Sequence, residues 1–379
     1  DKWDVQSGGK YYVIRNSSSI IAFEMPKKDF GAFMICASHT DSPSFKLKPD
    51  FEINADGCIK LSVEGYGGMI MSSWLDRPLS ISGRIVTAKN GKVETKLVNI
   101  DRDLLVIPSL AIHMSRDINK GYEFNIRRDM CPIASEKNGR IEDIIAENVG
   151  VDKEEILGFD LSLYNRMRGT VLGADGEYFS APRIDDLQCM YSTLEGFLNS
   201  ESDDNVTVFA AFDNEEVGSG TKQGAKSSFL RDVLERICNN SETYKRAVAK
   251  SFMLSCDNAH AVHPNFADKS DGTNRVYMNG GIVIKYNANQ RYTTDAVSEA
   301  VVKYVCKNAG VPYQMYANRS DIPGGSTLGN LSNEKVSLNT ADIGLAQLAM
   351  HSSYETAGSR DTEYMVKMIK EFYKTEIVL

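Results

Sequence analysis

The sequence predicts an α/β fold in which a mostly parallel central sheet carries helices on both faces and a β-rich insertion interrupts the chain. After Gly169, short apolar runs alternate with helical periodicities, as in strand–helix–strand crossovers. Between residues 49 and 168, short alternating strands separated by turn signals are typical of a small β-rich unit. We therefore expect a discontinuous domain of residues 1–48 and 169–379, interrupted by an inserted domain of residues 49–168.

The N-terminal segment is expected to give one strand to the central sheet. This strand is the apolar run Ala32–Ala37, and the polar sequence Ser38-His39-Thr40-Asp41 follows it directly. A lone buried strand needs a sheet to join, and the sheet of the C-terminal part is the simplest partner. In the insertion we expect strands at 53–63, where a glycine breaks the run, and at 81–87, 92–100 and 104–108, with helices near 140–148 and 153–157.

The C-terminal part is expected to supply the rest of the central sheet and its covering helices. Apolar positions at helical spacing predict a helix over 186–198, and a β-branched apolar run predicts a buried strand at Val206–Phe212. The remaining strands are expected at 252–256, 281–286, 311–316 and 336–338, and the remaining helices at 228–239, 242–250, 295–308 and 361–373.

The composition is ordinary for a globular enzyme, with 379 residues, 42% hydrophobic and 25% charged. A net charge of −8 argues against broad electrostatic capture of nucleic acid or an anionic membrane. No apolar run approaches the roughly 20 residues that span a membrane. Seven scattered cysteines without a Cys-x-x-Cys pair favour reduced thiols, and hence the cytoplasm. The chain begins at Asp1 without a methionine, which leaves open a preceding segment.

Two adjacent carboxylates, Glu215 and Glu216, follow the predicted strand Val206–Phe212. In open α/β sheets, ligands bind beyond the carboxyl ends of the strands. One acid there can hold a cation while the other moves a proton. The ordinary alternative for a lone Glu-Glu pair is a solvated turn.

Four other sequence positions place metal-binding side chain types in similar surroundings. His39 and Asp41 form a His-x-Asp motif after the first strand, and Asp257 follows the strand at 252–256. The alternative for His-x-Asp is a polar turn, and the ordinary interpretation of Asp185 or Asp186 taken alone is a helix N-cap. The other two of these four positions, Asp185 and His351, are expected in loops.

The ensemble is more informative than any of its members. Because a parallel sheet brings strand ends together at one edge, these residues are expected to meet there. Imidazole and carboxylate ligands without thiolates suit Zn²⁺, Co²⁺ or Mn²⁺ in a two-metal hydrolytic site. The sequence contains no Gly-x-Ser-x-Gly elbow, Walker loop, Gly-x-Gly-x-x-Gly or His-Glu-x-x-His motif, so serine hydrolases, NTPases and dinucleotide enzymes lack support.

Several motifs occur in order along the chain: Ser-His39-Thr-Asp41-Ser-Pro, Pro-Arg-Ile-Asp185, Asp-Asn-Glu215-Glu216-Val-Gly-Ser, Asp257-Asn-Ala-His-Ala-Val-His-Pro-Asn and Met-His351-Ser. Together they resemble the aspartyl aminopeptidase family of dinuclear zinc metallopeptidases. The segments Trp74-Leu-Asp76-Arg77 and Ile107-Pro-Ser-Leu-Ala-Ile-His113 resemble the inserted domain of that family. The resemblance spans essentially the whole chain, although the family usually carries more chain before Asp1.

The resemblance implies a zinc-exopeptidase type of fold and a pair of divalent metal ions, with zinc expected and Co²⁺ or Mn²⁺ as alternatives. By position, His39 and Asp257 hold one ion, and Glu216 and His351 hold the other. Asp185 bridges the two ions. The resemblance also makes Glu215 the general base and Asp41 its support.

The activity that the resemblance implies is removal of N-terminal aspartate or glutamate from peptides, through a metal-bridging water activated by Glu215. Lys285 and Tyr292 lie in segments that resemble substrate-side loops, although a strand-end lysine in solvent is an equal alternative for Lys285. The insertion is expected to form dimers that build a dodecamer, in which His113 reaches the active site of a neighbouring subunit. No nucleic acid or membrane partner is expected.

Two rival functions remain open from the sequence. A related two-metal exopeptidase or deacylase that acts on neutral substrates would share all the ligands. A noncatalytic assembly scaffold would instead have a degenerate site, which the presence of Glu215 and all five expected ligands argues against.

Overall fold

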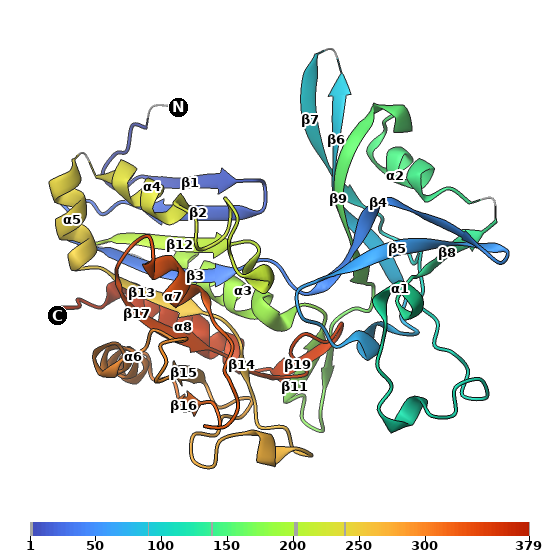
Figure 1. Cartoon of the computed structure of the whole chain (residues 1–379). Coiled ribbons are helices and arrows are strands. Elements are labelled where there is room, and N and C mark those ends of the chain that lie inside the picture. Colours follow the sequence, from blue (N-terminus) through green and yellow to red (C-terminus); the bar gives the residue numbers. More distant parts are fainter. Residues whose placement is uncertain (1–2, 90, 138, 201–203, 239, 379) are drawn as a thin grey trace. The chain divides into compact units, whose positions relative to one another are not determined.

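The computed structural model describes residues 3–89, 91–137, 139–200, 204–238 and 240–378. The chain divides into two compact units (Figure 1). The first unit comprises Asp1–Ser42, Thr170–Met350 and Glu355–Leu379, and the second comprises Pro43–Gly169 and His351–Tyr354. Residues 43–48 and 169 group with the second unit rather than the first, because the long strand β4 begins at Ser44 and pairs with strands of the insertion.

In the described residues, the first unit is built on an eight-stranded sheet of order β1-β2-β12-β3-β13-β17-β15-β16 (Figure 1). The strands are, in that order, β1 (Lys10–Arg15), β2 (Ser19–Glu24), β12 (Val206–Phe212), β3 (Phe33–His39), β13 (Phe252–Cys256), β17 (Asn339–Gly344), β15 (Ile282–Tyr286) and β16 (Tyr313–Ala317).

The prediction of a mostly parallel central sheet is not confirmed. Parallel pairing joins the four successive strands β12, β3, β13 and β17, and it also joins β15 to β16. Antiparallel pairing joins β1 to β2, β2 to β12, and β17 to β15. β1 and β2, which the sequence patterns do not predict, are joined by residues 16–18 alone, and so short a connection permits only antiparallel pairing.

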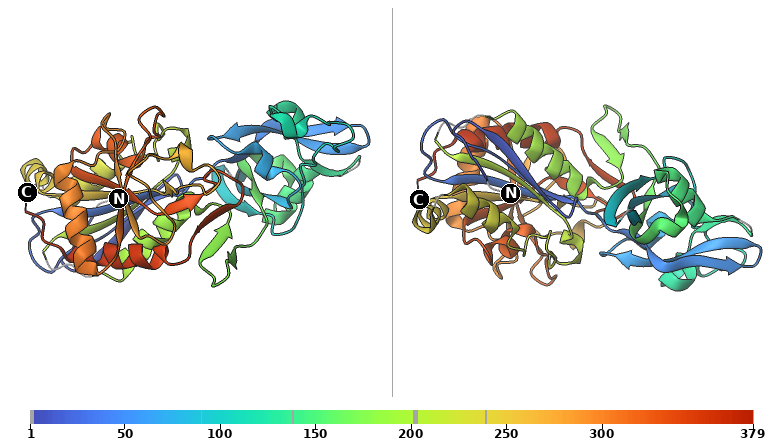
Figure 2. Two further views of the ribbon diagram at one scale, coloured as in Figure 1. Left: turned by 90° about the horizontal axis from the view of Figure 1, so that it is seen from below. Right: turned by 90° about the horizontal axis from the view of Figure 1, so that it is seen from above.

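Helices cover both faces of this sheet (Figure 2). Along β12, Phe209 and Ala211 pack into one hydrophobic core, while Val208 and Ala210 pack into another on the opposite face. The first core is closed by α3 (Ile184–Leu198), α6 (Ala296–Ala309) and α8 (Asp361–Lys374). The second is closed by α4 (Phe229–Ile237), α5 (Ser241–Ala249) and α7 (Leu328–Asn333). The predicted helix 228–239 corresponds to α4, and its last predicted residue, Asn239, lies outside the described residues.

The strand predicted at 336–338 is wrong, because β17 begins at Asn339. Buried polar residues in β17 disrupt the apolar pattern. Asp342, for example, is fully buried and accepts hydrogen bonds from the hydroxyls of Thr293 (2.7 Å) and Thr327 (2.6 Å). A smaller, largely antiparallel sheet completes the first unit, in the order β10 (Thr170–Leu172), β11 (Tyr178–Ala181), β19 (Glu355–Gly358), β18 (Ala346–Leu348) and β14 (Ala259–His260).

The second unit contains an antiparallel sheet with its own hydrophobic core. The strand order is β7 (Lys92–Asn99), β6 (Leu79–Lys89), β9 (Ile156–Asn165), β4 (Ser44–Ala55), β5 (Cys58–Tyr66) and β8 (Ile133–Glu136). The helices of this unit are α1 (Ile126–Asp129) and α2 (Ile141–Val149). Short 3₁₀ turns in the two units are η1 (Met71–Trp74), η2 (Ile118–Lys120), η3 (Lys153–Glu155), η4 (Glu215–Val217) and η5 (Ala267–Lys269).

Two predictions for the insertion differ from the structure. The helix predicted at 153–157 is wrong, because only the turn η3 forms before β9 begins. The strand predicted at 104–108 is reduced to isolated bridges at Leu105 and Val106. The predicted break of the run 53–63 at a glycine is confirmed, because β4 and β5 are joined by a turn at Asp56-Gly57. Within the described part of the chain, no helix is both long and apolar enough to cross a membrane.

The contact between α3 and α8 generates a stability prediction. A Cβ atom built at Gly196 of α3 would overlap the side chain of Ile369 in α8. Gly196→Ala is therefore expected to destabilise the fold by about 1–3 kcal/mol, a typical cost of overpacking a core. Urea unfolding followed by circular dichroism measures the change. Gly31→Ala is the matched control, because no atom lies within 4 Å of a Cβ built there. Equal stability of the two variants would contradict the packing described.

Candidate metal centre

Three neighbouring parallel strands of the first unit end at one edge of the sheet. Phe212 of β12 lies opposite His39, the last residue of β3, and β13 pairs with β3 on its other side. Glu215 and Glu216 follow β12, and Asp257 follows β13. This sheet edge therefore gathers one imidazole and three carboxylates, as the sequence predicts.

His39 is buried, and its two ring nitrogens face different partners. Nδ1 lies 3.0 Å from the backbone oxygen of Asp41, to which it can donate a hydrogen bond. Nε2 faces carboxylates instead, at 3.4 Å from Asp185 Oδ1 and 3.9 Å from Asp257 Oδ1. In metal sites a histidine commonly donates one ring N–H to a carbonyl and leaves the other nitrogen for the ion.

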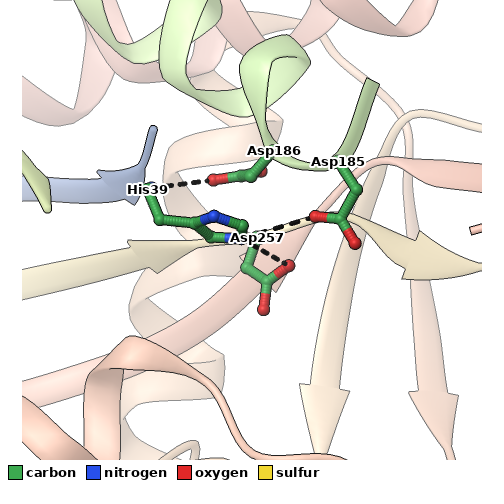
Figure 3. Close-up of side chains that lie close together, drawn as sticks. All are labelled: His39, Asp185, Asp186 and Asp257. Carbon is green, nitrogen blue, oxygen red and sulfur yellow. Dashed lines mark hydrogen bonds and ion pairs between the residues drawn. The ribbon is translucent and has the colours of Figure 1, made fainter. Parts of the chain in front are cut away.

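The two aspartates at the start of α3 both contact this edge. The hydroxyl of Ser42 donates to the backbone oxygen of Asp185 at 2.8 Å. Asp186 accepts a hydrogen bond from the backbone N–H of His39 at 3.1 Å (Figure 3). His39, Asp185, Asp186 and Asp257 each offer a ligand atom, and these atoms lie within 4.8 Å of one another.

Asp41 holds the turn that carries the two glutamates. Its Oδ1 accepts the backbone N–H of Glu215 at 3.0 Å, and its Oδ2 accepts that of Glu216 at 3.1 Å. Asn214, just before them, has a left-handed φ of 63°, which turns the chain out of β12. His39, Glu215 and Glu216 form a second group whose ligand atoms lie within 4.8 Å of one another. Asp41 thus orients the backbone of both glutamates.

The gathered carboxylates disturb the protonation of the site. Burial raises the pKa of Glu215 to about 7, against the lowering effect of His39. The carboxylates of Asp257 and Asp185 contribute to the same increase. Burial alone would lower the pKa of His39, but Asp186 and Asp185 help to raise it well above its ordinary value. Both shifts reflect negative charge concentrated in a space with little water.

The donor set fits a divalent cation. Zn²⁺, Co²⁺ and Mn²⁺ bind imidazole nitrogen together with carboxylate oxygens, which are the atoms that converge around His39 Nε2. A cation in this cluster would also offset the repulsion from Asp257 and Asp185, which adds to the effect of burial on the pKa of Glu215. The residues therefore match the kind of metal that the sequence predicts, while the number of ions and each ligand role stay predictions.

Lys285 and Tyr292 lie beside the Asp257 end of the cluster. Lys285 Nζ donates to the backbone oxygen of Asn258 at 2.8 Å and lies 3.6 Å from Asp257 Oδ2. It also lies 5.6 Å from the centroid of the Tyr292 ring. Burial would lower the pKa of Lys285, but Asp257 and Tyr292 raise it, so the amine is held charged. Lys285 is only 3% exposed, and the alternative of a solvated lysine is therefore wrong.

His113 and His351 belong to the second unit. His113 is exposed, in a segment between β7 and η2. His351 opens the four-residue segment 351–354, and its backbone oxygen accepts the N–H of Ile70 at 3.0 Å. The predicted roles of both histidines stay predictions.

Sequence reasoning misses two acidic residues that contact the cluster. The sequence suggests only an N-cap role for Asp186, although its position directly after Asp185 is a usable signal. Glu355 accepts the backbone N–H of Asp185 at 3.0 Å. No motif marks Glu355 in the sequence, because its partner lies 170 residues away in the chain.

Comparison with known proteins identifies similar sequences and structures. The family model described as "Aminopeptidase I zinc metalloprotease (M18)" matches residues 1–373. A curated relative from Clostridium acetobutylicum, named "Probable M18 family aminopeptidase 2", is 45% identical over 98% of this chain and 90% of its own length. A relative of the same name from Pseudomonas aeruginosa is 38% identical over 98% of this chain and 89% of its own length.

Solved structures agree with this similarity. A chain in the cryo-EM structure of "the Ape4 and Nbr1 complex" matches with a TM-score of 0.94 and 35% identity, covering 98% of this chain and 78% of the other. A structure of the Saccharomyces cerevisiae "mApe1 dodecamer" has a TM-score of 0.83 and 28% identity, covering 97% of this chain and 85% of the other.

The two hydrogen bonds to Asp41 generate a prediction. In Asp41→Asn, the side chain amide group would face a backbone N–H, so one of the two bonds to Glu215 and Glu216 must be lost. We expect zinc affinity, measured by competition with a chromophoric chelator, to fall by about 10–100-fold. Thr40→Val is the control, since the Thr40 hydroxyl bonds only to the backbone oxygens of Ser18 and Phe212 among the described residues. Unchanged affinity in a folded Asp41→Asn protein would refute this role.

Proposed function

Because this chain belongs to the M18 family of aminopeptidase I zinc metalloproteases, we propose that it removes N-terminal aspartate or glutamate from peptides, with Glu215 as the general base. The observation that carries the proposal is the convergence of His39, Asp185 and Asp257 at the strand edge where Glu215 also lies. A noncatalytic scaffold would not need this buried cluster of acids, which costs stability in the absence of a cation.

The chain supplies enough ligands for two ions. We assign His39 and Asp257 to one ion, Glu216 and His351 to the other, and Asp185 to a bridging position. Zinc is the proposed metal, as in the family description, and Co²⁺ or Mn²⁺ are the alternatives. When bound, such a pair activates water and polarises the carbonyl of the scissile bond.

Glu215 is proposed to move the proton. It takes a proton from the attacking water and returns it to the leaving amine of the shortened peptide. A carboxylate with a pKa of about 7 in the metal-free protein is suited to accept and release a proton near neutrality, although a nearby cation would lower that value. Asp41 is proposed to support this step through its bond to the Glu215 backbone.

Acidic specificity requires positive charge near the side chain of the substrate. Lys285 is the proposed source, with Tyr292 beside it, because this lysine is buried next to the metal ligand Asp257. One observation favours the rival function, an aminopeptidase for neutral residues. The amine of Lys285 already contacts Asp257 and the backbone of Asn258, which reduces the charge it can offer to a substrate.

We also propose roles for the two units and for their assembly. The first unit carries the catalytic machinery and the second mediates dimerisation. Dimers are proposed to build a dodecamer, as named for the yeast relative, with His113 reaching the active site of a neighbouring subunit and donating a hydrogen bond to the developing oxyanion. A cytoplasmic location is proposed from the reduced cysteines, which are all free thiols in the described residues.

Glu215→Gln tests the general base. Glutamine keeps the shape of the side chain but cannot accept a proton, so turnover is expected to fall by at least about 100-fold. Zinc content, measured by atomic absorption, is expected to stay unchanged, because Glu215 is not assigned as a ligand. Activity that survives this substitution would overturn the base assignment.

Lys285→Ala tests acidic specificity. The substitution removes the buried positive charge, so kcat/KM is expected to fall about tenfold or more for Asp- and Glu-terminal peptides relative to Leu- and Ala-terminal ones. The assay is run on protein of measured zinc content, since Lys285 also contacts the ligand Asp257. An equal loss for all four peptides would remove Lys285 from the specificity site. Chelation and metal restoration with the same peptides test the metal requirement itself.

A further inference from the structure

Glu355 is a buried carboxylate that has no assigned role in the proposed reaction. It begins β19 and is 1% exposed. Its two oxygens accept from different donors: Oε2 from the backbone N–H of Asp185 at 3.0 Å, and Oε1 from the side chain amide of Gln347 at 3.3 Å. The first of these donors belongs to Asp185, which is the proposed bridging ligand.

The chain of hydrogen bonds continues from Gln347 to the neighbourhood of another ligand. Asn258 Nδ2 donates to Gln347 Oε1 at 2.6 Å and to Gln188 Oε1 at 3.0 Å. Asn258 directly follows Asp257, and its backbone oxygen accepts from Lys285. Asn258 and Gln347 are buried, at 2% and 1% exposed. A continuous buried network therefore joins the Asp185 turn to the end of β13.

The direction of these bonds is fixed along the network. Asn258 Oδ1 accepts from the thiol of Cys189 at 2.9 Å, which leaves Nδ2 to donate to Gln347. Gln347 must then present its oxygen to Asn258 and its amide group to Glu355. Glu355 consequently meets a donor on each side. Only a carboxylate offers two acceptor oxygens in this place, whereas a glutamine offers one.

We infer that Glu355 is a positioning residue that fixes the Asp185 turn and, through Gln347 and Asn258, couples it to the strand end that carries Asp257. The inference rests on the proposed function, because it assumes that Asp185 and Asp257 bind metal. Partners that orient the ligands of a metal site typically change its affinity by about 10–100-fold when they are removed. The role of Glu355 is thus to hold two acidic ligands, from different elements of the first unit, in one geometry.

An exchange of the two side chain types tests this inference. In Glu355→Gln, one donor faces the glutamine amide group, and zinc affinity is expected to fall about 10–100-fold. In Gln347→Glu, two carboxylates face each other, and a similar loss is expected. The double variant Glu355→Gln/Gln347→Glu keeps the net charge and restores the hydrogen bonds described above. The amide now at position 355 can donate to the carboxylate now at position 347, and its oxygen can still accept from the backbone N–H of Asp185. Its zinc affinity is expected to return to within about threefold of the parent.

The measurements are made on the full chain, stripped of metal and titrated with Zn²⁺ against a chromophoric chelator. The visible absorption of bound Co²⁺ reports ligand geometry independently of activity, and its bands are expected to shift in Glu355→Gln and recover in the double variant. If Glu355→Gln does not fold, a folded double variant with parental affinity still supports the network. A folded double variant that binds zinc as weakly as Gln347→Glu overturns it.

Two controls separate this inference from the proposed function. Asp361 is a fully buried carboxylate that accepts the backbone N–H groups of Asn279 (2.6 Å) and Gly281 (2.9 Å), neither of which is a proposed ligand. Asp361→Asn is therefore expected to lower the unfolding temperature without changing zinc affinity. His39→Ala removes a proposed ligand directly. If zinc affinity survives His39→Ala, the proposed metal site is wrong. If zinc affinity falls in His39→Ala but is unchanged in Glu355→Gln, only the positioning role of Glu355 is wrong.

Discussion

The close approach of buried carboxylates to His39 is the constraint on which the site depends. His39 Nε2 lies 3.4 Å from Asp185 and 3.9 Å from Asp257, and Glu215 joins the same edge. Removing charges from water is costly, and like charges in one space repel each other, which is why the pKa of Glu215 rises. A divalent cation relieves both costs at once. The fold therefore holds an unfavourable charge arrangement that metal binding compensates.

The rest of the first unit holds this arrangement in place through groups that do not themselves bind metal in our assignment. Asp41 fixes the backbone of Glu215 and Glu216, and Glu355 fixes that of Asp185. Lys285 contributes a buried positive charge on the Asp257 side. Buried polar networks of this kind are favourable only when each member is paired, because an unpaired member loses its hydration without compensation. The supporting residues and the ligands thus depend on one another.

The strand ends at His39, Glu215 and Asp257 were predictable because a buried strand followed by polar residues leaves a clear local pattern. Strand direction was not predictable in the same way. β17 is buried and central, yet Asp342 and Thr340 disrupt its apolar pattern, and its antiparallel pairing with β15 has no sequence signal. In the insertion, the charged segment Lys153–Glu155 gave no clear signal either, so a predicted helix at 153–157 proved to be a turn and the start of a strand.

By itself, the sequence determined that His39, Glu215 and Asp257 follow strands at one sheet edge and which family the chain resembles, because local motifs at the ends of strands carry both signals. Only the tertiary structure decided what supports those side chains. Glu355 and Asp185 are 170 positions apart, and Gln347 and Asn258 are 89 apart. Hydrogen bonds over such separations follow from how strands and helices pack, and packing leaves no short-range pattern in the chain.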